Sequence, residues 1–234
     1  MVREFLHAIL KSKRARSPEF AREFQENLAN CDWQPHPLYS VFTQYDQEWY
    51  LEQREAFLHK YRCFYAVSRT LQPKKIIELG ACAGSGADAY LGGSPGAKYI
   101  GLDVFGVNFR HDDGSQWDPY KIAEQLFTDR KYKEWQLIRT DLRSLDRLPT
   151  RSDFVVVDAA HDFENEYADL RLALTAKPEF IFVDDADDEN AAKPAIEKFL
   201  EEDLADRVDF TFPVDYVGGG LVIKLRKSGN HRRS

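Results

Sequence analysis

This sequence of 234 residues has few cysteines, no excess of positive charge and no long hydrophobic stretch. The three cysteines, Cys31, Cys63 and Cys82, are odd in number and lack the spacing of a metal-binding motif. They indicate a reduced protein in the cytoplasm rather than a disulfide framework. Lysine and arginine total 32 against 39 aspartates and glutamates, which gives a formal net charge of −7. Such a balance argues against sequence-independent binding of nucleic acid, which needs a positive field.

No apolar run is long enough to cross a lipid bilayer, and Arg3 and Glu4 interrupt any signal-like start. We therefore expect no membrane partner and a soluble, cytoplasmic protein. The chain is nevertheless 43% hydrophobic and 13% aromatic, which is enough for a sizeable core. Its length favours one main domain with added segments over two small domains.

The first 72 residues predict helices that precede this domain. Apolar side chains recur at helical spacing over 2–12, and Ser-Pro-Glu at 17–19 is typical of a helix start, with serine as the cap and proline in the first turn. A long helix is expected over 48–71, where the aromatic residues recur near helical spacing and favour a core face over a binding site. We predict a helical cap or oligomerisation segment over 1–72, through which a homo-oligomer would form.

Strand and helix patterns alternate from Lys75 onward, which predicts an α/β domain over 73–227 with a mostly parallel sheet and helices on both faces. Strands are expected near 75–80, 98–103, 135–140, 153–158 and 179–184, with helices near 84–92, 118–129, 162–174 and 189–202. Two further strands, near 207–212 and 220–226, have no room for a helix between them. They predict an antiparallel hairpin that completes a seven-stranded sheet. The polar tail at 228–234 is predicted to be disordered.

A nucleoside-binding pattern begins this domain. The apolar strand at 75–80 is followed by glycines at Gly80, Gly84 and Gly86, and the next strand ends in Asp103. Glycines let a ligand approach the backbone, and a carboxylate at the end of the second strand suits the paired hydroxyls of a ribose. A nicotinamide-dependent enzyme would favour the spacing G-x-G-x-x-G, whereas this chain has G-x-x-x-G-x-G.

The segment ELGACAGSGA resembles the first motif of class I S-adenosylmethionine-dependent methyltransferases, especially the metal-dependent O-methyltransferases related to catechol O-methyltransferase. The closing hairpin suits the Rossmann-like sheet of that family. The resemblance implies that Glu78 and the backbone around Gly80 and Gly84 hold the methionine end of S-adenosylmethionine. It also implies that Asp103 binds the ribose and that Asp141 lies near the adenine, although Asp141 also suits an ordinary turn at a strand end.

Three aspartates follow two neighbouring strands of the predicted sheet. Asp158 ends the fourth strand, and Asp184 and Asp185 end the fifth. Strand ends in such a sheet open onto one crevice, so these like charges would converge and favour a hard divalent cation, with Mg²⁺ expected. The resemblance implies the same three residues as metal ligands. The alternative is that they cap the helices that follow.

His161 lies three positions after Asp158. A related group of methyltransferases and antibiotic-biosynthesis proteins resembles this D-x-x-H pattern, and a histidine can accept a proton near neutral pH. We therefore predict that His161 is the catalytic base; the alternative is that it orients a carboxylate or caps a helix.

Together these patterns predict a metal-dependent O-methyltransferase that acts on a hydroxyl of a small molecule. In this hypothesis the metal would acidify and position the acceptor hydroxyl for in-line methyl transfer. Other hypotheses are a metal-dependent hydroxylase or lyase on the same scaffold, a non-catalytic cofactor-binding protein, and a nicotinamide-dependent enzyme.

Overall fold

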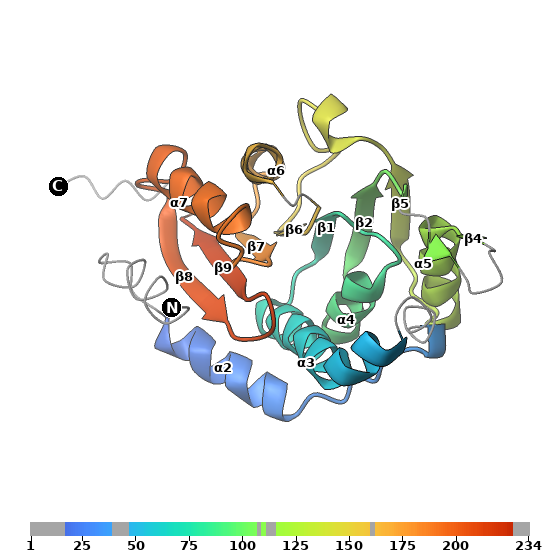
Figure 1. The fold of residues 1–234 in the computed structure, drawn as a ribbon. Coiled ribbons are helices and arrows are strands. Elements are labelled where there is room, and N and C mark those ends of the chain that lie inside the picture. Colours follow the sequence, from blue (N-terminus) through green and yellow to red (C-terminus); the bar gives the residue numbers. More distant parts are fainter. Residues whose placement is uncertain (1–16, 39–46, 107–108, 111–115, 160–161, 227–234) are drawn as a thin grey trace.

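The computed structural model describes residues 17–38, 47–106, 109–110, 116–159 and 162–226 (Figure 1). The helix predicted over 2–12 and the tail predicted at 228–234 lie outside these residues.

A seven-stranded sheet forms the centre of the described chain. Its strands are β1 (Lys75–Leu79), β2 (Lys98–Asp103), β5 (Trp135–Arg139), β6 (Phe154–Val157), β7 (Phe180–Asp184), β8 (Val208–Val214) and β9 (Gly220–Leu225). The order across the sheet is β5-β2-β1-β6-β7-β9-β8. The first five pair in parallel, while β9 pairs antiparallel with both β7 and β8. The predicted sheet and its C-terminal hairpin are confirmed.

Helices cover both faces of the sheet, which makes three layers (Figure 1). On one face lie α2 (Pro18–Ala29), α3 (Gln47–Leu71), α4 (Ser85–Gly93) and α5 (Pro119–Asp129), and on the other lie α6 (Phe163–Thr175) and α7 (Ala192–Glu202). Each corresponds to a predicted helix. The sequence did not predict the short ladder of β3 (Phe109–Arg110) with β4 (Gln116–Trp117), nor the 3-10 turn η2 (Leu142–Ser144).

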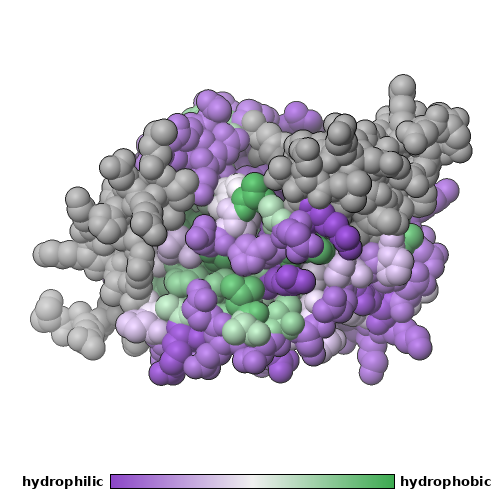
Figure 2. All heavy atoms as spheres, turned by 60° about the horizontal axis from the view of Figure 1, so that its bottom comes forward, coloured by the Kyte–Doolittle hydropathy of each residue, from purple (hydrophilic) through white to green (hydrophobic). Residues whose placement is uncertain are grey.

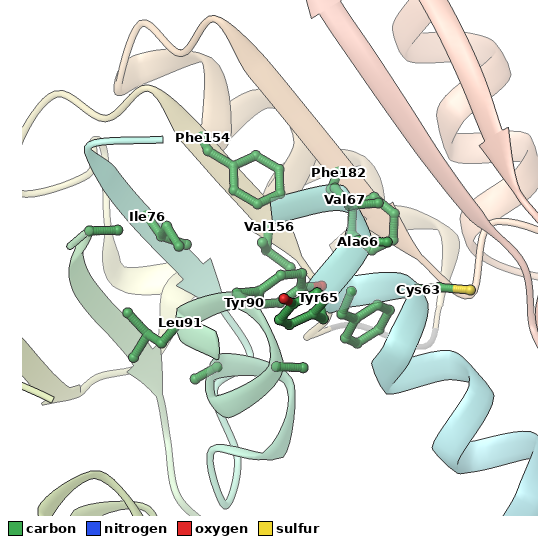
Figure 3. Close-up of a cluster of buried hydrophobic side chains, with 14 of the residues drawn as sticks. Cys63, Tyr65, Ala66, Val67, Ile76, Tyr90, Leu91, Phe154, Val156 and Phe182 are labelled. Atoms are coloured by element: carbon green, nitrogen blue, oxygen red, sulfur yellow. The ribbon is translucent and has the colours of Figure 1, made fainter. Parts of the chain in front are cut away.

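Alternation along the strands supplies a separate hydrophobic core to each face. On β1, Ile76 packs with the α2–α5 layer, whereas Ile77 and Leu79 pack with the α6–α7 layer. In the first core, Tyr90 of α4 lies against the strand residues Phe154 and Phe182, at ring-centroid distances of 5.8 and 6.2 Å (Figure 3). Since both faces are buried, β6 (FVVV) and the first four residues of β7 (FIFV) are continuous apolar runs, while β1 has one buried acid, Glu78.

The N-terminal helices share the first core with the sheet. Ser17 caps α2, because its hydroxyl accepts a hydrogen bond from the N–H of Phe20, as the sequence predicted. Phe20 and Phe24 of this helix pack on Phe212 of β8, with centroids 4.9 and 5.3 Å apart. Through these contacts, α2 belongs to the same packed unit as the sheet.

Figure 2, which turns the bottom of Figure 1 toward the reader, shows mostly hydrophilic side chains among the coloured residues, with a group of hydrophobic ones at the centre.

The longest described helix, α3, has 25 residues. Neither it nor any other helix in the described part combines the length and hydrophobicity of a membrane-spanning segment.

Candidate functional site

The candidate site lies where the order of the sheet reverses, between β1 and β6. The chain proceeds outward from β1 to β2 and β5, and then starts again on the other side at β6 and β7. Open α/β sheets bind ligands at such a switch point, beyond the carboxyl ends of the strands. Gly80 follows β1 at a φ of +91°, and a Cβ there would lie 1.9 Å from the carbonyl oxygen of Asp158. Glycine therefore allows the two strand ends to approach closely.

Two cavities meet at Gly80, which lines both. The larger has a volume of about 310 Å³ and includes Asp103 and Asp141 in its wall. The smaller, of about 100 Å³, is lined by Lys60 of α3, Glu78 of β1 and Asp158, among other residues. Of the residues predicted to bind the cofactor, Asp103 and Asp141 therefore line the larger cavity, Glu78 lines the smaller one and Gly80 lines both, whereas Gly84 lines neither.

Asp103, the last residue of β2, is fixed by the glycine-rich loop. The backbone N–H of Cys82 donates to its Oδ2 at 2.9 Å, and the N–H of Phe105 donates to its Oδ1. A carboxylate oxygen can accept more than one hydrogen bond, so both oxygens retain capacity for hydroxyl donors. Asp103 lies in the wall of the larger cavity, and its role at a ribose stays a prediction.

Asp141 lines the larger cavity and also caps η2. Its side chain accepts from the backbone N–H of Arg143 at 3.1 Å and pairs with the Arg143 Nε at 2.9 Å. The hydrogen bonds from Arg143 lower the pKa of Asp141, so the group is ionised at neutral pH. Asp141 thus has the turn geometry of the alternative interpretation and lies in the cavity as well.

The glycine loop after β1 is shaped by its neighbours. Gly84 caps α4 at a φ of +81°, and a Cβ there would be 3.1 Å from the ring of Phe127. A Cβ at Gly86 would be 2.8 Å from Oε1 of Glu78. Gly86 therefore leaves the space that the Glu78 carboxylate occupies.

Glu78 is a buried acid that faces the smaller cavity. Its side chain is on the α2–α5 face of the sheet, where the hydroxyl of Tyr99 donates to its Oε2, and the residue is 1% exposed. Burial raises the pKa of Glu78 to about 8, although the hydrogen bond from Tyr99 acts in the opposite direction. A cationic group bound beside this carboxylate would favour its ionised form.

The three predicted metal ligands come together. Carboxylate oxygens of Asp158, Asp184 and Asp185 lie within 4.8 Å of one another. Asp184 is buried, and its Oδ1 accepts from the Tyr216 hydroxyl at 2.6 Å and from the Asp185 N–H at 2.9 Å. Burial, together with the negative charge of Asp184, raises the pKa of Asp158 well above its usual range. We refer to these three aspartates as the carboxylate cluster.

Lys60, which the sequence analysis did not select, lies among these carboxylates. Its Nζ is 2.6 Å from Oδ2 of Asp184 and 3.6 Å from Oδ1 of Asp185. Burial alone would lower the pKa of Lys60, but the nearby aspartates, Asp184 foremost, raise it overall. A signal was present in the sequence: Lys60 is four residues before the buried Phe64 and so lies on the core face of α3.

Gly218 of the β8–β9 turn lies very close to Asp185, one member of the carboxylate cluster. Asp185 has a positive φ of +47°, and a Cβ at Gly218 would lie 2.2 Å from its Oδ1. The backbone N–H of Asp187 donates to the carbonyl of Gly218 at 3.0 Å. The absence of side chains on the turn glycines therefore permits this close contact with the residues after β7.

The residues present give mixed support for a bound divalent metal. Three converging carboxylates supply the hard oxygen ligands that Mg²⁺ prefers. However, the ammonium of Lys60 already contacts two of them. His161 lies outside the described residues, so its predicted role as base stays a prediction.

Comparisons with known proteins agree with this geometry at the level of the fold. No protein-family model matches the sequence, and no curated protein matches it either. Among solved structures, the chain resembles the methyltransferase PaMTH1 of Podospora anserina bound to S-adenosylhomocysteine, at 15% identity and a TM-score of 0.56 over 91% of this chain and 97% of that one. A methyltransferase from Geobacter sulfurreducens gives 15% identity and a TM-score of 0.55, covering 92% of this chain and 98% of that one. The O-methyltransferase TomG of Streptomyces achromogenes, in complex with S-adenosylmethionine, gives 16% identity and a TM-score of 0.52, covering 88% of this chain and 98% of that one. The chain thus has the Rossmann-like fold of class I S-adenosylmethionine-dependent methyltransferases.

Proposed function

We propose that the protein is an S-adenosylmethionine-dependent methyltransferase that acts on a hydroxyl of a small molecule. The observation that carries the proposal is the pair of cavities that meet at Gly80, with Asp103 in one and Glu78 in the other. Two adjacent cavities of this kind suit a cofactor in which the ribose and the amino acid belong to one molecule. The likeness to solved O-methyltransferases supports the choice of oxygen as acceptor.

In this proposal the nucleoside occupies the larger cavity. Asp103 accepts hydrogen bonds from the ribose hydroxyls, and Asp141 lies near the adenine. The methionine end would enter the smaller cavity, where the buried Glu78 would accept from the cofactor's ammonium and the backbone at Gly80 would border its chain. Gly84, for which the same role was predicted, caps α4 next to that cavity without lining it. The positive amino group offsets the cost of burying an ionised Glu78.

Methyl transfer then takes place beside Asp158 and Lys60, which line the smaller cavity. A lone pair of the acceptor oxygen forms the new bond to the methyl carbon as the sulfur–carbon bond breaks, which leaves S-adenosylhomocysteine. The hydroxyl proton passes to a base, and His161 is the predicted candidate. A His161→Ala variant should lose turnover while it retains affinity for S-adenosylmethionine.

A methyltransferase that depends on a divalent cation such as Mg²⁺ is a second candidate on the same site. The convergence of Asp158, Asp184 and Asp185 favours it, because such an ion would neutralise the cluster and hold the acceptor. The ion pair of Lys60 with Asp184 opposes it, because the positive charge is already supplied.

The test is isothermal titration of S-adenosylmethionine and S-adenosylhomocysteine into the full-length protein, with NAD as the comparison ligand. Saturable binding of the first two and none of NAD is expected. A panel of catechols, phenols and sugars with radiolabelled cofactor would then identify the acceptor. If NAD binds and S-adenosylmethionine does not, the methyltransferase proposal is wrong.

A hydroxylase and a non-catalytic cofactor-binding protein make different predictions. Mass spectrometry of the product separates them, because a methyltransferase adds a methyl group and a hydroxylase adds an oxygen atom. A non-catalytic protein would bind S-adenosylmethionine but yield neither product with any acceptor in the panel.

A further inference from the structure

Lys60 provides a cation at the position for which a metal was predicted. Its Nζ lies 2.6 Å from Asp184 Oδ2 and 3.6 Å from Asp185 Oδ1, and it borders the same cavity as Asp158. Lysine carries its positive charge at neutral pH, so the charge faces all three members of the carboxylate cluster. The side chain of Lys60 is only 14% exposed.

The position of Lys60 is fixed by its surroundings. The residue belongs to α3, whose next turn is anchored by Phe64, which is 1% exposed and stacks on Tyr90 at 4.9 Å. The Nζ of Lys60 also lies over the rings of Phe64 and Tyr216, 5.6 and 5.8 Å from their centroids. These cation–π contacts add to the attraction of the carboxylates. To leave the cluster, the ammonium would have to give up all of these contacts together.

Asp184, which holds Lys60, is itself fixed. Its Oδ1 accepts hydrogen bonds from the Tyr216 hydroxyl and the Asp185 N–H, while Oδ2 faces the ammonium. A magnesium ion needs its oxygen ligands at about 2.0–2.1 Å in near-octahedral geometry. An ion that used Asp184 Oδ2 would therefore lie directly beside the Lys60 ammonium, as a second positive charge in a partly buried site. The two cations compete for one position.

We propose that Lys60 is the resident cation of the carboxylate cluster and that the protein works without a bound divalent metal. The claim that catalysis needs no divalent metal rests on the proposed methyl transfer. The claim that Lys60 occupies the carboxylate cluster in place of a metal does not. Lys60 is a positioning residue in this proposal: it fixes Asp184 and Asp185 and neutralises part of their charge.

The experiment is a titration of Mn²⁺ into the full-length protein. Electron paramagnetic resonance measures the concentration of free Mn²⁺ at each step. The wild-type protein should show no saturable site in the presence of S-adenosylhomocysteine. The variant Lys60→Met should gain one saturable site, which binds Mn²⁺ at least about tenfold more tightly than the residual, non-saturable binding of the wild type. Adding Asp184→Asn to Lys60→Met should abolish the gained site, because the cluster then loses a ligand.

Lys224→Met is a matched control. The Nζ of Lys224 lies 3.5 Å from Oδ2 of Asp209 and over the rings of Phe180 and Phe210, 5.7 and 5.5 Å from their centroids. The substitution therefore removes an ion pair and two cation–π contacts, as Lys60→Met does, but outside the carboxylate cluster. This variant should bind Mn²⁺ no better than the wild type. Lys60→Arg, which keeps the charge, should also gain no site.

Saturable, stoichiometric binding of Mn²⁺ by the wild-type protein would overturn the proposal, and this result needs no variant to fold. Methyl transfer that is abolished by a chelator and restored by Mg²⁺ would overturn it as well. The titration of S-adenosylmethionine tests the methyltransferase proposal separately, because it does not depend on the binding of Mn²⁺.

Discussion

The carbonyl oxygen of Asp158 occupies the space into which any side chain at Gly80 would project, since a Cβ there would lie only 1.9 Å away. The backbone at Gly80 also has a φ of +91°, which L side chains rarely adopt. Because Gly80 lines both cavities, this one contact sets how closely the end of β1 approaches the end of β6.

Gly80→Ala should therefore destabilise the fold and widen the crevice. We expect a loss of at least about 3 kcal/mol in the free energy of unfolding, since the clash is with backbone and adds to the strain of the positive φ. Denaturant unfolding measures it. Gly96→Ala is the control, because a Cβ at that glycine has nothing within 4 Å. Equal stability of the two variants would contradict the packing described for Gly80.

Asp103→Ala should weaken binding of S-adenosylhomocysteine by at least about tenfold, or ~1.4 kcal/mol. The change removes the predicted acceptor for the ribose and also the anchor of the Cys82 N–H in the glycine-rich loop. Isothermal titration measures the affinity. Asp146→Ala, at an exposed position of the same charge, should bind like the wild type. An unchanged affinity in Asp103→Ala would remove Asp103 from the cofactor site.

The strands of the main sheet and the α-helices of the described chain were predictable because each depends on a local sequence pattern, whereas the β3–β4 ladder and η2 were not predicted. Apolar runs gave the parallel strands, and the absence of room for a helix between the last two strands gave the hairpin. The convergence of Asp158 and Asp184 also follows from the sequence, since parallel neighbours bring their carboxyl ends together.

The helical spacing places Lys60 on the core face of α3, but its partner could not be derived in the same way. Its partner Asp184 is 124 residues further along the chain (184 − 60), and only the packing of α3 against the sheet brings the two together. A lysine in an amphipathic helix usually projects its charge into water. The close approach of Gly218 to Asp185 likewise depends on tertiary structure, because the turn glycines alone do not reveal which strand end they cover.

Phe182→Ala should cost about 3 to 5 kcal/mol of stability, because it leaves a cavity in the first core. Phe182 is fully buried, and its ring lies 5.4 Å from that of Phe64 and 6.2 Å from that of Tyr90. Thermal and denaturant unfolding measure the loss. Val217→Ala, at a position 49% exposed, should change stability by no more than about 0.5 kcal/mol. A loss in Phe182→Ala no larger than that would mean that this core is not close-packed.

Glu78 should make the stability of the protein without cofactor depend on pH. Its pKa is raised by burial from 4.5 to about 8, so the folded state binds the proton more tightly than the unfolded state. For an acid of this kind, the stabilisation is complete below the unfolded pKa and is lost as the pH rises through the folded pKa. The window is therefore between 4.5 and about 8.

Glu78→Gln removes this titration while it keeps an acceptor for the Tyr99 hydroxyl. The variant should gain stability relative to the wild type between about pH 5 and about pH 9, by an amount on the order of a few kcal/mol. Unfolding of both proteins across this range measures the difference, and taking the difference cancels the other buried acids, Glu166 and Asp169, whose pKa values are also raised by burial. Saturating S-adenosylmethionine should reduce the pH dependence of the wild type, because its ammonium would stabilise the ionised carboxylate. Parallel pH profiles for wild type and variant would show that Glu78 has the same pKa in the folded and the unfolded protein, which would contradict the effect of burial described for this carboxylate.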